Sequence, residues 1–228
     1  MEDTVLVIAP HPDDAEFGAA GAVAHWAAEG RPVYYVVCTN GDKGSNDPEM
    51  TSERIAAIRR QEQLEAAAVL GVKQVHFLDY PDGALEDTAD FRGNLVYYIR
   101  KYRPFTVVTT DPYRRYLWHR DHRITGRAAL DAVFPYARDH LSYPEHLAEG
   151  LSTHRVKEVY LWAADEPNHY VDISAVFDTK LKAGLSHRSQ LGGRHNNLEG
   201  WLRERATTLG EAAGYPLAEA FYRLEIPF

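Results

Sequence analysis

Three residues near the start of the chain have side chains of the kinds that bind divalent metal ions. His11, Asp13 and Asp14 stand around Pro12, directly after an apolar run. Because the fixed φ of proline favours the first helical position, His11 and Asp14 point towards a common position, whereas Asp13 projects at a different angle. One imidazole and one carboxylate are two of the three protein ligands of a catalytic zinc site, which keeps a further position for water. The spacing predicts His11 and Asp14 as ligands and leaves Asp13 free.

A second cluster of the same residue types, His119-Arg120-Asp121-His122, offers a third ligand. We predict that His122 completes the metal site. A metal ion lowers the pKa of its bound water towards neutrality, and Asp13 is then the general base that accepts the proton. Each cluster alone is also typical of solvated side chains and helix caps. Both clusters follow predicted strands, however, and parallel α/β sheets bind ligands at the carboxyl ends of their strands.

The elements that position these clusters follow an alternating pattern. Short apolar, β-branched runs alternate with helical segments, which is typical of a parallel sheet covered by helices on both faces. The predicted strands are 4–9, 33–38, 75–78 and 105–109, with helices over 14–29, 51–70 and 87–102 between them. Later elements are a helix over 120–138, strands over 156–163 and 170–172, helices over 174–190 and 197–213, and an edge strand over 220–226. We expect a single α/β domain over residues 1–228 with a Rossmann-like, mostly parallel sheet.

The composition argues against polyanionic partners. The chain carries a formal net charge of -8, and an acidic protein is repelled by nucleic acid and by anionic lipid. No window approaches the roughly 20 consecutive apolar residues of a membrane span, and the first residues are acidic where a signal peptide is basic. The lone cysteine, Cys38, lies in an apolar run and cannot form an internal disulfide. We expect a soluble, cytoplasmic protein that acts on a small molecule.

A family resemblance is carried by the segment Val7-Ile8-Ala9-Pro10-His11-Pro12-Asp13-Asp14-Ala15-Glu16-Phe17-Gly18, which is similar to the signature of the LmbE/PIG-L zinc-dependent de-N-acetylases. The resemblance continues through 39–44, 59–62, 70–72, 82–83, 119–122 and 180–190. It implies a hydrolase that removes the acetyl group from an N-acetylglucosamine-type conjugate. It also implies Zn²⁺ as the cofactor, although the same ligands accept Fe²⁺ or Co²⁺. Members of the family often assemble, so a homo-oligomer is a further expectation.

The resemblance implies roles for further residues. The ligands would again be His11, Asp14 and His122, with Asp13 as base. His119 would stabilise the oxyanion or protonate the departing amine, and Asp121 would orient it and favour its cationic form. Turn or helix-cap roles are the alternative for three residues implied to line the sugar pocket, Asp42, Asp82 and His187.

Arg59 matches an arginine that the family directs at the site, where it would bind a hydroxyl or an acidic group of the substrate. An exposed ion pair with Glu62 on the same helix is the alternative. Leu117 stands where some members have a tyrosine that contributes to the oxyanion site, and Tyr113 or Tyr116 would have to replace it.

Two other functions fit the same sequence. One is hydrolysis of another amide or of an ester, because the same metal and water serve all acyl transfers. The other is a non-catalytic, Rossmann-type binding module that uses the glycines of Gly18-Ala19-Ala20-Gly21, although these lack the G-x-G-x-x-G order.

Overall fold

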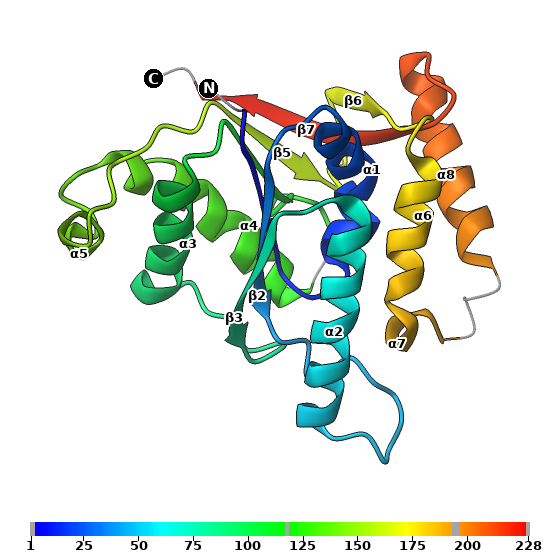
Figure 1. The fold of residues 1–228 in the computed structure, drawn as a ribbon, viewed down its shortest axis with the longest axis horizontal. Helices are drawn as coiled ribbons and strands as arrows, with labels where there is room; N and C mark the ends of the chain where they lie inside the picture. The colour runs from blue at the N-terminus through cyan, green and yellow to red at the C-terminus, as the bar shows by residue number, and fades with distance from the viewer. Residues whose placement is uncertain (1–2, 117–118, 193–196, 227–228) are drawn as a thin grey trace.

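The computed structural model describes residues 3–116, 119–192 and 197–226 of the chain (Figure 1). Within these ranges, seven strands form one sheet in the order β3-β2-β1-β4-β5-β7-β6. The strands are β1 (Val5–Ala9), β2 (Val33–Thr39), β3 (Gln74–Tyr80), β4 (Thr106–Thr110), β5 (Glu158–Trp162), β6 (His169–Asp172) and β7 (Ala218–Glu225). β1 to β5 pair in parallel, and β7 is antiparallel to both β5 and β6. The predicted Rossmann-like fold is therefore confirmed.

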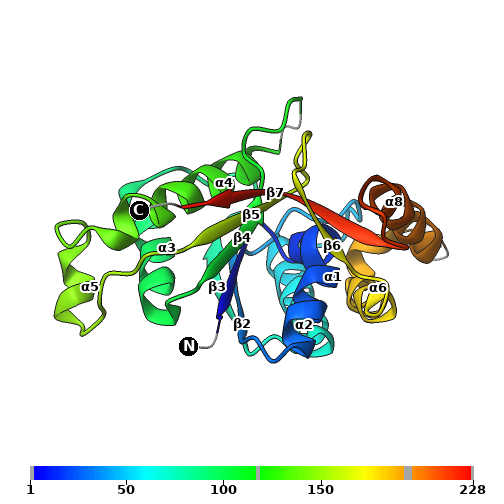
Figure 2. The same ribbon diagram turned by 90° about the horizontal axis from the view of Figure 1, so that it is seen from above.

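Helices cover both faces of the sheet (Figures 1 and 2). One side carries α1 (Asp14–Ala28), α2 (Ser52–Leu70), α6 (Phe177–Ser186), α7 (Arg188–Leu191) and α8 (Leu198–Ala213). The other side carries α3 (Ala89–Tyr102), α4 (Arg120–Val133), the short 3-10 helix Tyr136–Arg138 and α5 (Pro144–Ala148).

Each face of the sheet has its own apolar core, because successive strand residues point to opposite faces. Val5 and Val7 of β1 belong to the core beneath α1. Leu6 and Ile8 of the same strand belong to the core beneath α3 and α4. Cys38 lies in this second core as a free, buried thiol, as predicted.

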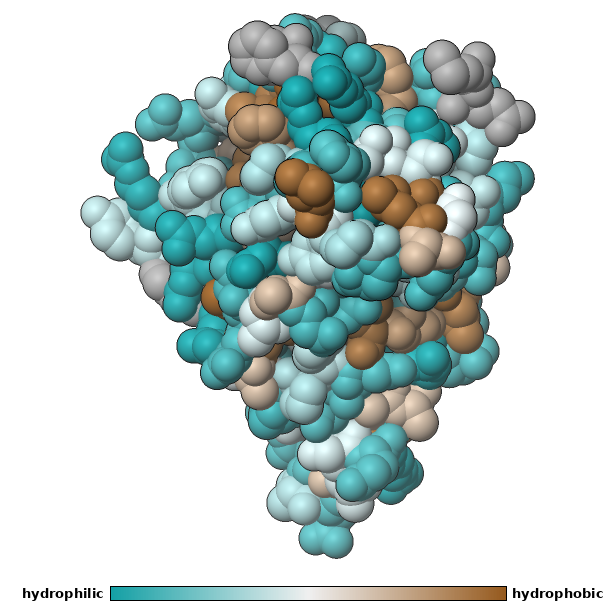
Figure 3. Space-filling view, turned by 90° about the vertical axis from the view of Figure 1, so that its left-hand side faces the viewer, coloured by the Kyte–Doolittle hydropathy of each residue, from teal (hydrophilic) through white to brown (hydrophobic). Residues whose placement is uncertain are grey.

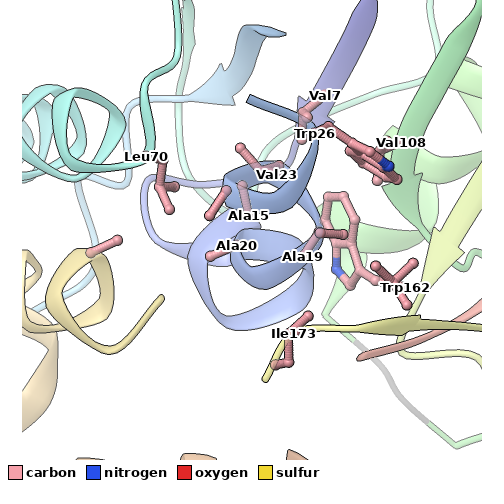
Figure 4. Close-up of a cluster of buried hydrophobic side chains, with 14 of the residues drawn as sticks. Val7, Ala15, Ala19, Ala20, Val23, Trp26, Leu70, Val108, Trp162 and Ile173 are labelled. Carbon is pink, nitrogen blue, oxygen red and sulfur yellow. The ribbon is translucent and has the colours of Figure 1, made fainter. Parts of the chain in front are cut away.

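Two glycines allow α1 to pack closely against its neighbours. A Cβ atom on Gly18 would lie 2.6 Å from Cδ1 of Trp162, and one on Gly21 would lie 2.5 Å from Cγ2 of Ile173. Figure 4 shows Trp162 and Ile173 beside α1, near Ala19. Packing therefore explains the glycines that the binding-module alternative assigned to a nucleotide.

Three predicted elements differ from the structure. β7, predicted as an edge strand, lies between β5 and β6, because strand order depends on long-range pairing. The helix predicted over 120–138 ends at Val133, since the residue before Pro135 is disfavoured in helical conformation and Phe134 is extended. The helix predicted over 174–190 is divided into α6 and α7 at His187.

The surface is mostly hydrophilic on the side that carries α3 and α5, where hydrophobic residues form small, separate patches (Figure 3). None of the helices in the described parts of the chain is long and apolar enough to cross a membrane.

Gly21→Ala is expected to destabilise the fold because the new Cβ has no space beside Ile173. Overpacking of this kind lowers the free energy of unfolding by about 1–3 kcal/mol, which urea denaturation measures. Gly184→Ala in α6 is the matched control, since the atom nearest to its added Cβ is 3.6 Å away. The control should be neutral or stabilising by up to about 1 kcal/mol. Equal effects of the two substitutions would contradict the packing explanation.

Candidate metal centre and active site

The candidate site lies where the strand order of the sheet reverses. β1 pairs with β2 on one side and with β4 on the other, in parallel in both cases. Open α/β sheets bind ligands at the carboxyl ends of the strands that flank such a switch point. The cluster that starts at His11 follows β1, and the cluster over 119–122 follows β4. The fold therefore brings the two predicted clusters to one place.

The turn between β1 and α1 sends adjacent carboxylates in different directions. The main-chain N–H of His11 donates to Oδ2 of Asp14 at 2.9 Å, so the Asp14 side chain folds back over the turn. Asp13 is the N-cap residue of α1, has φ 102° and ψ -27°, and caps no main-chain amide with its side chain. A positive φ at a residue other than glycine stores about 1–3 kcal/mol of strain. This strained backbone keeps the Asp13 carboxylate apart from that of Asp14.

One carboxylate oxygen joins the two predicted imidazole ligands. Oδ2 of Asp14 lies 2.9 Å from Nδ1 of His11 and 3.2 Å from Nε2 of His122. Donor atoms bound about 2.0–2.2 Å from one tetrahedral ion lie about 3.3–3.6 Å apart. These two contacts are therefore close to the spacing of donors around a zinc ion, and the chemical types of the three side chains fit that metal.

The second ring nitrogen of His11 faces two further carboxylates. Nε2 lies 3.0 Å from Oδ2 of Asp121 and 3.1 Å from Oδ1 of Asp82. A metal-bound histidine commonly donates its other N–H to a carboxylate, which fixes the ring orientation. Oδ2 of Asp121 also accepts from the main-chain N–H of Gly83 at 2.7 Å. Burial alone would raise the pKa of Asp121, but the hydrogen bonds from His11 and Gly83 hold that pKa below its ordinary value.

The predicted pairing of the Asp121 carboxylate with His119 is wrong, because that carboxylate contacts His11 instead. His119 is the N-cap of α4, and the main-chain N–H of Asp121 donates to its Nδ1 at 3.3 Å. This contact leaves the ring proton on Nε2, which lies 3.8 Å from Oδ1 of Asp82. Burial, followed by the positive charges of His11 and His122, lowers the pKa of His119. The neutral form is therefore favoured, in contrast to the predicted cationic form.

Two other combinations of donors lie close enough together to hold an ion. Among the described residues, the ligand atoms of two overlapping groups lie within 4.8 Å of one another: His11, His119 and His122, and His11, Asp82, His119 and Asp121. Asp14 belongs to neither group, yet it contacts two of the imidazoles directly. Its side chain is 17% exposed, whereas that of His119 is 46% exposed. These contacts and this burial favour Asp14 as the ligand and leave His119 at the opening.

Asp13 faces both a cation and a pocket. Its Oδ1 lies 3.3 Å from Nη2 of Arg59. Burial and the nearby charge of Asp14 raise the pKa of Asp13 to about 6, against the opposing effect of Arg59. A carboxylate with this pKa is a suitable general base near neutral pH. Asp13 also lines a pocket of about 730 Å³ together with Phe17, Gln190, Leu191, Asn197, Leu198 and Trp201.

Arg59 is only 4% exposed, so the alternative of an exposed ion pair with Glu62 is wrong. Its Nη1 donates to the main-chain oxygen of Gly41 at 3.0 Å, and its Nη2 donates to that of Pro12 at 2.6 Å. The guanidinium therefore ties the turn after β1 to the loop after β2. Arg59 therefore stabilises the backbone of the site, whereas the sequence predicted that it contacts the substrate.

The other residues predicted to line the sugar pocket have different surroundings. Asp42 accepts a hydrogen bond from the main-chain N–H of Asp82 at 3.0 Å and so supports the loop after β3. Asp82 itself faces His11 within the metal cluster. His187 is 0% exposed and bonds Glu16, so the prediction that it lines the pocket is wrong. Leu117 lies outside the described residues.

Sequence reasoning missed the aromatic wall of the pocket and a buried glutamine. Phe17 and Trp201 come from α1 and α8, and their ring centroids are 6.2 Å apart. Trp201 is 45% exposed, and a large aromatic side chain on the polar side of a helix is the signal that could have found it. Gln63 is fully buried next to Asp13, but glutamine is a residue type that is mostly exposed.

Several known proteins with similar sequences and folds are deacetylases. A model of the PIG-L family, described as GlcNAc-PI de-N-acetylase, matches residues 6–133. A diacetylchitobiose deacetylase of Thermococcus kodakarensis is 36% identical over 94% of this chain and 80% of its own length. A probable N-acetyl-alpha-D-glucosaminyl L-malate deacetylase 2 of Bacillus cereus is 32% identical over 83% of this chain and 84% of its own length. The solved structure of N,N'-diacetylchitobiose deacetylase from Pyrococcus horikoshii, complexed with an inhibitor, has a TM-score of 0.92 at 34% identity and covers 98% of this chain and 84% of its own.

His122→Ala is expected to remove most of the bound divalent metal, because it deletes one of three donor side chains. Metal content per chain after dialysis, measured by plasma mass spectrometry, is the readout. His140→Ala is the matched control, since the His140 side chain is 76% exposed. Equal metal content in both variants would argue against His122 as a ligand.

Asp121→Asn is expected to weaken metal binding by about 10- to 100-fold, the usual cost of removing a carboxylate that orients a ligating histidine. Asp121 accepts from His11 and Gly83 through Oδ2 and from Leu85 through Oδ1, so the amide of the asparagine sets its NH₂ group against one of these donors and removes the negative charge beside His11. Competition with a chromogenic chelator measures the affinity. An unchanged dissociation constant would show that the contact with His11 does not support the metal.

Proposed function

Because the chain belongs to the PIG-L family of de-N-acetylases, we propose that it removes the acetyl group from an N-acetylglucosamine-type conjugate by metal-assisted amide hydrolysis. The observation that carries the proposal is the Asp14 oxygen that lies between the nitrogens of His11 and His122. Asp13 stands beside this group without belonging to it, which is the arrangement that hydrolysis by a general base needs.

We assign the metal to His11, Asp14 and His122, with Zn²⁺ as the expected ion. The donor set of two nitrogens and one oxygen is that of many catalytic zinc sites, and Fe²⁺ or Co²⁺ would fit it as well. When bound, the ion would polarise the acetyl carbonyl and lower the pKa of the attacking water.

Asp13 moves the protons in this proposal. Its carboxylate accepts one proton from the attacking water as the new C–O bond forms. The same proton then passes to the nitrogen of the amide as the C–N bond breaks, so that a free amine and acetic acid form, and the acid releases its proton to water to give acetate. A pKa of about 6 suits a group that must take up and release one proton in each turnover.

His119 serves the carbonyl oxygen in this proposal. Because its Nδ1 accepts from the Asp121 amide, its Nε2–H is available at the opening of the site. A neutral imidazole stabilises a developing oxyanion as a hydrogen-bond donor. It cannot readily give up its remaining proton, so the amine receives its proton from Asp13.

The pocket beside Asp13 suits an amino sugar. Its walls combine aromatic rings with the amide groups of Gln190 and Asn197, and small-molecule sites commonly pair an apolar wall with a few polar groups. The two relatives named above are deacetylases of diacetylchitobiose and of N-acetyl-alpha-D-glucosaminyl L-malate. We propose the N-acetylglucosamine unit common to both as the reactive part of the substrate, and the cytosol as the place of the reaction.

Asp13→Asn is expected to lower turnover by about 10²- to 10⁴-fold, the usual contribution of general acid–base catalysis, while metal content stays unchanged. Acetate release from N,N'-diacetylchitobiose and from related conjugates of N-acetylglucosamine measures the activity. Chelation should abolish it, and Zn²⁺ should restore it. Asp178→Asn, which changes an exposed residue of α6, is the control. Wild-type turnover in Asp13→Asn would rule out the assigned base.

A further inference from the structure

The peptide unit between Pro12 and Asp13 is held at both of its polar atoms by one helix. Nη2 of Arg59 donates to the Pro12 oxygen at 2.6 Å, and Oε1 of Gln63 accepts from the Asp13 N–H at 3.0 Å. Arg59 and Gln63 are four residues apart in α2, so they lie on the same face of that helix. The peptide that sets the direction of Asp13 is thus clamped between two side chains of α2.

The clamp acts on a backbone that would otherwise relax. Asp13 has φ 102°, a conformation that residues with a side chain rarely adopt unless their surroundings impose it. Rotation of this peptide would swing the Cα–Cβ bond and carry the carboxylate away from the metal cluster. The hydrogen bond from Asp13 to Gln63 opposes that rotation.

The orientation of the Gln63 amide is itself determined by its neighbours. Its Nε2 donates to Oε1 of Glu16 at 3.0 Å. The Asp13 N–H needs an acceptor and the Glu16 carboxylate needs a donor, so only one of the two amide orientations satisfies both.

A buried histidine completes the chain of contacts. Nε2 of His187 lies 3.0 Å from Oε2 of Glu16. Because Glu16 offers an acceptor, Nε2 of His187 carries a proton and donates it to the carboxylate, while Nδ1 has no hydrogen-bond partner among the described residues. Gln63 and His187 are 0% exposed and Glu16 is 1% exposed. None of the three can touch a substrate, and their contacts lead to Asp13.

We propose that Gln63 is a positioning residue for the reaction, which holds the strained Asp13 backbone so that the carboxylate meets the attacking water, and that Glu16 and His187 fix the Gln63 amide in the required orientation. This inference rests on the proposed role of Asp13 as the base. It also explains why Gln63, Glu16 and His187 are buried, although burial of polar groups costs free energy.

An exchange of the two partners tests this role. Gln63→Glu sets two carboxylates against each other. The single oxygen of the amide in Glu16→Gln can face either Gln63 or His187, so one of the two hydrogen bonds that Glu16 accepts is lost. Each single variant should lose about 10- to 100-fold in kcat, the effect of a misplaced catalytic group, with KM and metal content nearly unchanged. The double variant, Gln63→Glu with Glu16→Gln, restores every donor and acceptor at the same net charge. It should recover most of the lost kcat.

Gln61→Glu is the matched control, since Gln61 is an exposed glutamine of the same helix whose side chain donates only to Glu65 among the contacts described for it. Its kcat should equal that of the wild type. If Gln63→Glu does not fold, Gln63→Met keeps the volume, removes both hydrogen bonds and takes its place.

Hydrogen–deuterium exchange of metal-free protein gives a readout that does not depend on turnover. The Asp13 amide should exchange faster in both single variants than in the wild type, and the double variant should restore its protection. Unchanged exchange, single variants with full kcat, or a double variant no better than the worse single variant would overturn the proposal. If Asp13→Asn loses activity but none of the Gln63 and Glu16 variants does, the clamp alone is refuted. Full activity in Asp13→Asn would refute the base instead, and exchange would then still decide the clamp.

Discussion

The site depends on one carboxylate oxygen placed between two imidazoles that arrive from different strands. Oδ2 of Asp14 meets Nδ1 of His11 and Nε2 of His122, and Asp82 and Asp121 face the far nitrogen of His11. Carboxylates gathered at this density repel one another unless positive charge lies among them. A divalent cation in the proposed site would supply that charge. β1 and β4 are neighbours in the sheet, so the two clusters that follow these strands meet at one edge.

The short turn after β1 directs the side chains of Asp13 and Asp14 to different places. Asp14 folds back towards His11 and the start of α1, whereas the positive φ of Asp13 turns the neighbouring carboxylate towards the pocket. Such strain persists only where surrounding contacts impose it. Here the contacts come from Arg59 and Gln63 of α2. A helix that touches no part of the pocket opening thus controls the group assigned to proton transfer.

The sequence predicted most of the fold and brought the two clusters to one site, and most of the exceptions arise from contacts between distant segments. Apolar runs and the spacing around Pro12 are local patterns, so the strands near His11 and two clusters of side chains that the structure brings together could be predicted. The partner of Asp121 was wrong because His119 is its neighbour in sequence, whereas His11 is its neighbour in space. His187 was placed in the pocket, and the inner position of β7 was missed, for the same reason: burial and strand order arise from pairing between distant segments.

The most direct test of the central claim is the anomalous-diffraction map of crystals grown with Zn²⁺. We expect one ion bonded at about 2.0–2.2 Å to His11 Nδ1, to a carboxylate oxygen of Asp14 and to His122 Nε2, with the Asp13 carboxylate close by but not bonded. An ion held instead by His11, Asp82, His119 and Asp121, or an ion bonded to Asp13 itself, would contradict this assignment of the ligands.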